Sequence, residues 1–192
     1  MKRLLQGSDY NWIEETATDL IEDLGLKWFP VSEFEVAHLL GIEVRKYSEL
    51  SREDRAFVIS KNPLGCSKRL GNKYIIWYND FKPRRMIRFT IWHEIAHIQL
   101  GHIEGDCTKN DERLEQEANH FAAYVLAPLA FVHQLGLNSP QQIADVCEIS
   151  LECASNVYAN YVRVFQFPSI RRRILGERII ALLSYRQRAV VA

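Results

Sequence analysis

Two histidines with a glutamate between them are the residues whose types and spacing most clearly permit chemistry. They lie in "RFTIWHEIAHIQLGH", residues 88–102, as His93-Glu94-x-x-His97. On a helix, His93 and His97 lie one turn apart on the same face, so both imidazoles can reach one zinc ion at about 2.0–2.1 Å. Glu94 points about 100° further round the helix and can take a proton from a water molecule. The pattern therefore predicts metal-assisted hydrolysis with Glu94 as the general base.

A catalytic zinc site usually has three protein ligands, and an acidic stretch further along the chain offers candidates for the third. Glu115 and Glu117 lie in "DERLEQEANHFAAYVLAP", residues 111–128. On a helix these two side chains point about 200° apart, so they cannot both face the metal. Helix geometry favours Glu115, because Asn119 follows one turn later and can hydrogen-bond a ligand histidine. Glu117 remains the alternative, and is otherwise expected to be solvated or in a surface ion pair.

The third histidine of the first stretch, His102, is not predicted to bind the metal. If the helix continued, His102 would point about 180° away from His93. Gly101 is expected to end the helix, and His102 can then cap it or line the cleft. His120 and Tyr124, in the acidic stretch, are assigned no role because core packing is the commoner fate of such side chains.

Together the two stretches resemble the paired motifs of the ImmA/IrrE metallopeptidase family. The second motif of that family runs Glu-x-x-Ala-Asn/Asp-x-Phe-Ala-Ala-x-Leu-Leu-x-Pro, and this chain has "EQEANHFAAYVLAP" at residues 115–128. Val125 and Ala127 depart slightly from the residues that the family often has. The resemblance covers about residues 30–165, and it implies a gluzincin-like site with one zinc ion per chain, two histidine ligands, Glu115 as the third ligand and Glu94 as the base.

The resemblance also implies a biological role. Family members are cytoplasmic peptidases of bacteria and their mobile elements, and they cleave helix-turn-helix repressors to relieve repression of transcription. Some members carry a repressor-type DNA-binding domain at the N-terminus. Few residues precede the first motif here, so the expected substrate is a separate repressor protein. The alternative hypothesis is a non-catalytic, metal-containing regulator that binds a repressor or DNA.

Composition limits the other classes of function. The 24 basic and 24 acidic residues give no net charge, which argues against binding to nucleic acid or to a membrane surface through bulk charge. The basic triplet at residues 171–173 is more often a solvated helix face. There is no apolar run of about 20 residues and no Cys-x-x-Cys pair, so a cytoplasmic protein with reduced thiols and no membrane contact is expected.

The elements that must position these residues give an α+β fold, mostly helical with a small, mainly antiparallel three-stranded sheet. In this fold the helix that carries His-Glu-x-x-His packs beside a second helix that carries the third ligand. Hydrophobic periodicity predicts helices at residues 11–26, 30–41, 83–100, 112–127 and 170–184. Alternation predicts strands at residues 42–47, 56–60 and 73–79, with residues 62–71 as a hairpin loop.

Two domains are predicted: a zinc metallopeptidase domain at residues 1–132 and a C-terminal helical segment at residues 138–192. Within the second, "QQIADVCEISLECASNVY" has the outline of a helix-turn-helix, with a turn at residues 148–150. Its second helix, residues 151–161, carries no Lys or Arg, so phosphate neutralisation would be weak. Direct binding to nucleic acid is therefore not expected, and the pair is predicted to pack or to dock the substrate.

Overall fold

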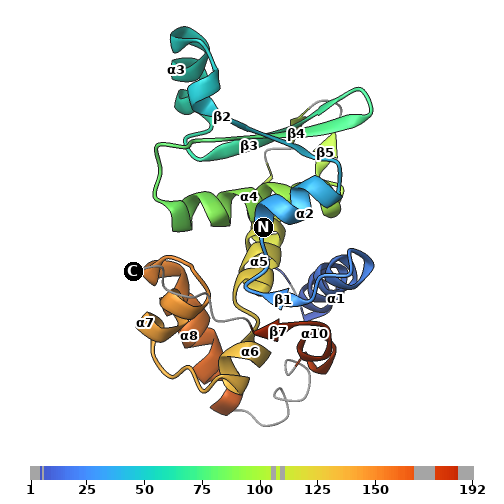
Figure 1. The fold of residues 1–192 in the computed structure, drawn as a ribbon, viewed down its shortest axis with the longest axis vertical. Helices are drawn as coiled ribbons and strands as arrows, with labels where there is room; N and C mark the ends of the chain where they lie inside the picture. The colour runs from blue at the N-terminus through green and yellow to red at the C-terminus, as the bar shows by residue number, and fades with distance from the viewer. Residues whose placement is uncertain (1–4, 6, 105–106, 109–110, 167–175, 186–192) are drawn as a thin grey trace. The chain divides into compact units, whose positions relative to one another are not determined.

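The chain divides into two compact units, residues 1–17 with 32–122, and residues 18–31 with 123–192. The first unit contains every residue that the sequence identifies as a candidate metal ligand or base. The computed structural model describes the following residues (Figure 1): 5, 7–104, 107–108, 111–166 and 176–185.

A mixed sheet forms one layer of the first unit (Figure 1). Its three main strands lie in the order β2-β4-β3, at Glu43–Lys46, Lys73–Tyr78 and Gly65–Leu70. β4 returns between the other two strands, so it is antiparallel to β3 and parallel to β2. Two short strands, β6 (Cys107–Thr108) and β5 (Ile103–Glu104), extend the sheet beyond β3. The predicted α+β class is confirmed, and the sheet is mixed rather than purely antiparallel.

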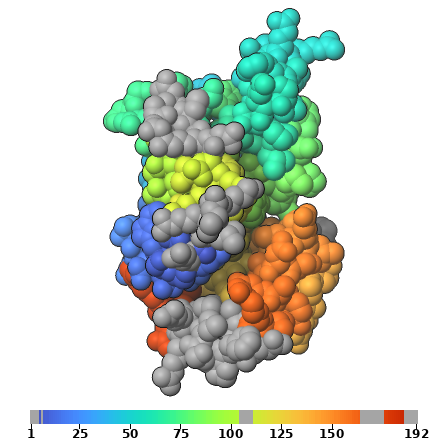
Figure 2. Space-filling view, turned by 180° about the vertical axis from the view of Figure 1, so that it is seen from behind, coloured from blue at the N-terminus to red at the C-terminus, as the bar shows by residue number. Residues whose placement is uncertain are grey.

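The strand predicted at residues 56–60 is wrong, because these residues belong to helix α3 (Arg52–Lys61). The Ser51 side chain caps this helix by accepting a hydrogen bond from the Asp54 N–H, and acidic residues occupy the first turn. These helix-start residues outweigh the β propensity of a few β-branched and aromatic residues. α3 buries none of its residues, and Figure 2 shows it standing out from the rest of the first unit.

The third main strand, β3, lies where a hairpin loop was predicted, at residues 62–71. Ser67 is the one residue of β3 that is buried, so the apolar alternation that identifies a strand is missing. The strand forms through its pairing with β4, and a two-residue loop, Gly71 and Asn72, joins the two. Gly71 has φ +60°, a conformation that glycine adopts without strain.

Helix α4 (Arg84–Gln99) lies against β3 and β4 and carries the His-Glu-x-x-His stretch. Its inner face is apolar, with Ile91, Trp92 and Ile95 fully buried. α2 (Glu33–Leu39) packs on α4, and the predicted cap Ser32 accepts a hydrogen bond from the Glu35 N–H. The structure confirms the four helices predicted at residues 11–26, 30–41, 83–100 and 112–127. The first and the last of these are α1 (Gly7–Asp23) and α5 (Glu112–Leu126).

A buried ion pair ties α2 to α4. Arg88 Nη1 donates to Glu33 Oε2 at 2.8 Å, and Arg88 and Glu33 are 1% and 0% exposed. Arg84 contacts the other oxygen of the Glu33 carboxylate. A buried charge pair adds little net stability, but the loss of one partner leaves a buried charge without compensation. Arg88 therefore fixes the start of α4 relative to α2.

The second unit is helical. Phe29 of β1 stacks on Phe131 of α6, with ring centroids 4.6 Å apart. α7 and α8 meet at the predicted turn, where Glu148 has φ +56°. Residues 170–175 of the last predicted helix, with the basic triplet, lie outside the described residues. The elements are α6 Leu129–Gln134, α7 Pro140–Val146, α8 Leu151–Gln166 and α10 Glu177–Leu182, with β1 (Trp28–Phe29) parallel to β7 (Ser184–Tyr185).

Among the residues that the structure describes, every helix is too short or too polar to cross a bilayer.

Candidate metal centre

The two histidines of α4 face each other across one helical turn. His93 Nε2 and His97 Nε2 are 3.0 Å apart. His97 is buried, at 1% exposed, and the His93 side chain is 15% exposed. Residues four apart on a helix lie on the same face. The structure therefore brings the two predicted ligands together.

Glu115, from the first turns of α5, completes a group of three. Its two oxygens lie 3.3 Å from His93 Nε2 and 3.3 Å from His97 Nε2. When a metal ion binds ligands tetrahedrally at about 2.0–2.1 Å, the ligand atoms are about 3.3–3.4 Å apart. The observed separations of 3.0, 3.3 and 3.3 Å match this pattern, so these side chains could hold one metal ion. Two histidines and one carboxylate leave a fourth position open for water or substrate.

Glu115 and His93 shift each other's pKa. Hydrogen bonds from His93 and His97 hold the pKa of the Glu115 carboxyl far below its ordinary value. Burial tends to lower the pKa of His93, but hydrogen bonding to Glu115 and the charge of Glu94 outweigh burial and raise it. Protons and a metal ion would therefore compete for His93 Nε2.

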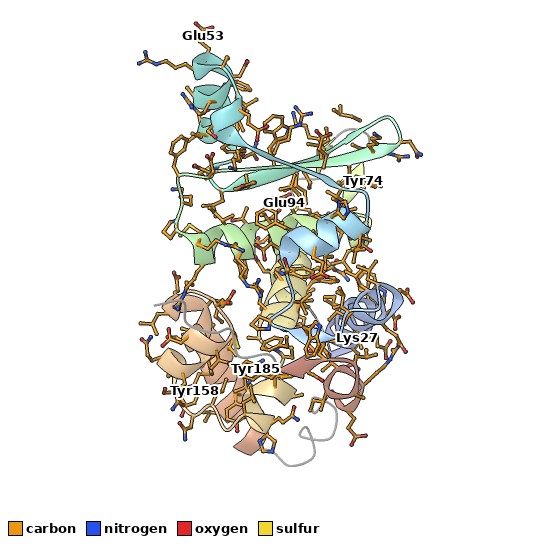
Figure 3. The ribbon with its side chains drawn as sticks, viewed as in Figure 1. Lys27, Glu53, Tyr74, Glu94, Tyr158 and Tyr185 are labelled. Carbon is orange, nitrogen blue, oxygen red and sulfur yellow. The ribbon has the colours of Figure 1, made fainter. Side chains whose placement is uncertain are left out.

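Glu94 lies on the side of α4 that faces β3 (Figure 3), and it is 6% exposed. Burial raises the pKa of its carboxyl group, while the neighbouring His93 and a hydrogen bond with the Ser67 side chain oppose the rise. Ser67 lies on β3 and is itself buried. Ser67 was not among the predicted site residues, because residues 62–71 were predicted to form a hairpin loop rather than a strand. A buried carboxylate beside a metal site can accept a proton at near-neutral pH.

A cleft of about 380 Å³ opens over these side chains, between β3 on one side and α4 and α5 on the other. Residues 65–68 of β3, His93 and Glu94 of α4, and Glu115 of α5 all line it. Gly65 allows the close approach of strand and helix, since a Cβ there would lie 2.5 Å from Thr90 Cγ2. The candidate base therefore lies at the wall of the cleft, beside the ligand group.

Asn119 follows Glu115 by one turn and lines the same cleft. It lies near enough to His93 to contribute to the raised pKa of that histidine. The structure therefore places Asn119 next to a ligand histidine, as the helix geometry predicts. Its role in metal binding stays a prediction.

Glu117 and His102 are both buried and lie next to each other. Glu117 was predicted to be solvated or in a surface ion pair, but it is 4% exposed and lies 3.0 Å from His102 Nε2. His102 is 5% exposed, and its Nδ1 is 3.0 Å from His97 Nδ1. Burial and the neighbouring His97 lower the pKa of His102. Glu115 and Glu117 have different histidine partners, since Glu115 faces His93 and His97 whereas Glu117 faces His102.

His120 and Tyr124 of the acidic stretch both pair with residues of α1. His120 Nε2 lies 3.0 Å from Glu14 Oε1 of α1, and its ring meets Tyr10 edge-on. The Tyr124 hydroxyl lies 3.1 Å from Thr18 Oγ1.

Comparison with protein families identifies a peptidase family. The model of peptidase family M78, described as the IrrE N-terminal-like domain, matches residues 39–156, which is more than half of the chain and includes the whole group of candidate site residues. Comparison with curated proteins gives no match.

Proposed function

The chain belongs to peptidase family M78, the IrrE N-terminal-like family, and from this membership we propose that it is a zinc-dependent endopeptidase. The observation that carries the proposal is the convergence of His93, His97 and Glu115, with ligand atoms 3.0–3.3 Å apart. Imidazole and carboxylate ligands in this number suit zinc, and an open fourth position is typical of a catalytic rather than a structural site.

Each side chain of the site has a distinct task in this proposal. His93, His97 and Glu115 would hold the zinc ion. When bound there, zinc would polarise the scissile carbonyl and make a water molecule acidic enough to react near pH 7. Glu94 takes the proton from the attacking water and passes it to the leaving amine as the peptide bond breaks.

The burial of Glu94 supports its role as the base. A carboxylate in water has a pKa near 4 and is a weak base, whereas burial raises the pKa of Glu94 and makes it a better proton acceptor. The Ser67 hydrogen bond holds the carboxylate against β3 and still leaves Glu94 at the wall of the cleft. A structural metal site would need neither this buried base nor an open position.

We further propose that the substrate is a separate helix-turn-helix repressor, whose cleavage relieves repression of transcription. The similarity of residues 88–102 and 115–128 to the ImmA/IrrE motifs supports this choice. The test is to incubate the zinc-loaded protein with a repressor encoded beside its gene, and to identify the fragments by mass spectrometry.

Fragments should form with zinc, disappear with a chelator, and return when zinc is added again. Stable binding of the repressor without fragments would contradict the peptidase proposal and would support a non-catalytic regulator. Cleavage of unrelated peptides but not of the repressor would contradict only the substrate assignment.

A further inference from the structure

A line of buried polar side chains runs behind the candidate ligand His97. His97 Nδ1 lies 3.0 Å from His102 Nδ1, and His102 Nε2 lies 3.0 Å from Glu117 Oε2. Arg113 Nε donates to the other oxygen of Glu117 at 2.8 Å, and Arg113 Nη2 donates to Asp9 Oδ1 at 3.2 Å. The three members nearest the metal site are each 5% exposed or less. Such buried groups are stable only when every donor has an acceptor.

The partners in this line determine where the protons lie. Glu117 is an acceptor that already pairs with Arg113, so the nitrogen facing it, His102 Nε2, must carry a proton. A neutral His102 then has no proton on Nδ1, and that atom accepts from His97 Nδ1. The reverse arrangement would bring two acceptors, His102 Nε2 and Glu117 Oε2, to 3.0 Å. When a metal ion takes the place of a proton on Nε2, the atom that faces His93 and Glu115, His97 keeps its proton on Nδ1 and the Nε2 lone pair would bind the ion.

The end of α4 explains how His102 reaches this position. The Gly101 N–H donates to the Ile98 carbonyl, and the His102 N–H donates to the His97 carbonyl at 2.8 Å. This pair of hydrogen bonds is the Schellman motif, with Gly101 in the left-handed region at φ +71°. The motif brings the second residue after the helix cap next to the residue three positions before the cap, which here are His102 and His97. Helix termination itself therefore brings the two rings together.

We propose that His102 is a positioning residue: it accepts the Nδ1 proton of His97, and so holds that ring in the tautomer and orientation that bind metal through Nε2. Glu117 and Arg113 in turn fix His102. This inference rests on the proposed zinc site. Partners of this kind behind a ligand histidine typically change metal affinity by 10- to 100-fold.

The chain offers a matched control for the test. His120 and Glu14 form a second histidine–glutamate pair at 3.0 Å, which joins α5 to α1. Zinc affinity is measured on the full-length apoprotein by competition with a chromophoric chelator. His102→Leu should bind zinc about 10- to 100-fold more weakly than wild type. His102→Asn keeps an acceptor near the Nδ1 position and should recover part of the loss, and His120→Leu should match wild type.

The proton positions are read from wild type alone, so this measurement does not depend on whether a variant folds. Long-range 1H–15N NMR of zinc-loaded protein labelled at histidine should place a proton on His97 Nδ1 and none on His102 Nδ1. A proton on His102 Nδ1, or equal zinc affinity of wild type and His102→Leu, would overturn the positioning role and leave the proposed function intact. Failure of wild type to bind zinc would refute the proposed function, and this inference with it.

Discussion

Replacing Gly65 with alanine should introduce a methyl group at the closest approach of β3 to α4, next to the candidate base. The added Cβ would lie 2.5 Å from Thr90 Cγ2, 3.1 Å from the Trp77 carbonyl oxygen and 3.8 Å from Glu94 Cγ. Carbon atoms in ordinary contact are about 3.5–4.0 Å apart. The strand or the helix must therefore move by about 1 Å, because the Thr90 methyl group sits on a short side chain of a buried helix.

Overpacking of this size typically costs about 1–3 kcal/mol of unfolding free energy. A second substitution tests whether the Thr90 methyl group is the cause. Thr90→Ser removes Cγ2 but keeps the hydroxyl, which donates to the Met86 carbonyl at 2.9 Å. Alone it should cost about 0.5–1.5 kcal/mol, as the loss of one buried methyl group does. In the double variant the main clash is gone, and only the 3.1 Å contact with the Trp77 carbonyl remains.

The assay is urea unfolding of wild type, both single variants and the double variant, followed by tryptophan fluorescence, to which the buried Trp92 contributes. The double variant should be more stable than the sum of the single effects predicts by about 1 kcal/mol or more. Additive changes in the unfolding free energy would show that Gly65 is not in contact with Thr90, and would refute the close packing of β3 against α4.

Three further predictions follow from other parts of the first unit. Arg88→Met should cost about 3 kcal/mol of unfolding free energy, because Glu33 then stays buried with only Arg84; Glu33→Leu added to it should restore most of the loss, as urea unfolding would show. Because the pKa of His93 is raised, protons should begin to displace zinc at a higher pH than they would from an ordinary histidine. Below that raised pKa the affinity measured by chelator competition should fall about tenfold per pH unit, and a flat profile from about pH 8 to about pH 5 would contradict this. Gly101→Ala should cost about 1 kcal/mol through backbone conformation alone, since its Cβ meets no atom within 4 Å, and an unchanged unfolding midpoint would argue against the left-handed cap.

The sequence alone was sufficient for the parts of the site that depend on helix periodicity. His93, His97, Glu115 and Asn119 all lie on two helices with clear start and stop residues, so their relative directions follow from 100° per residue. The α+β class followed from the same patterns, because long amphipathic helices and the apolar strand β4 leave little room for another class.

The parts that were missed depend on contacts between elements. β3 is a polar strand that exists because β4 pairs with it, and Ser67 was therefore overlooked as the partner of Glu94. His102 could have been placed from the sequence, since Gly101 at the end of α4 indicates a Schellman motif that brings His102 back to His97. Its second partner, Glu117, could not, because nothing in the local pattern shows which element covers that face of α5.

We propose Glu94 as the proton acceptor at a zinc site formed by His93, His97 and Glu115. The most direct measurement is the rate at which zinc-loaded Glu94→Gln protein cleaves a peptide mixture, relative to zinc-loaded wild type. Glutamine keeps the size of the side chain and leaves the three ligands in place, so zinc content should not change. Because the base is lost, we expect cleavage that is about 10²- to 10⁴-fold slower than wild type. Equal rates at equal zinc content would contradict it.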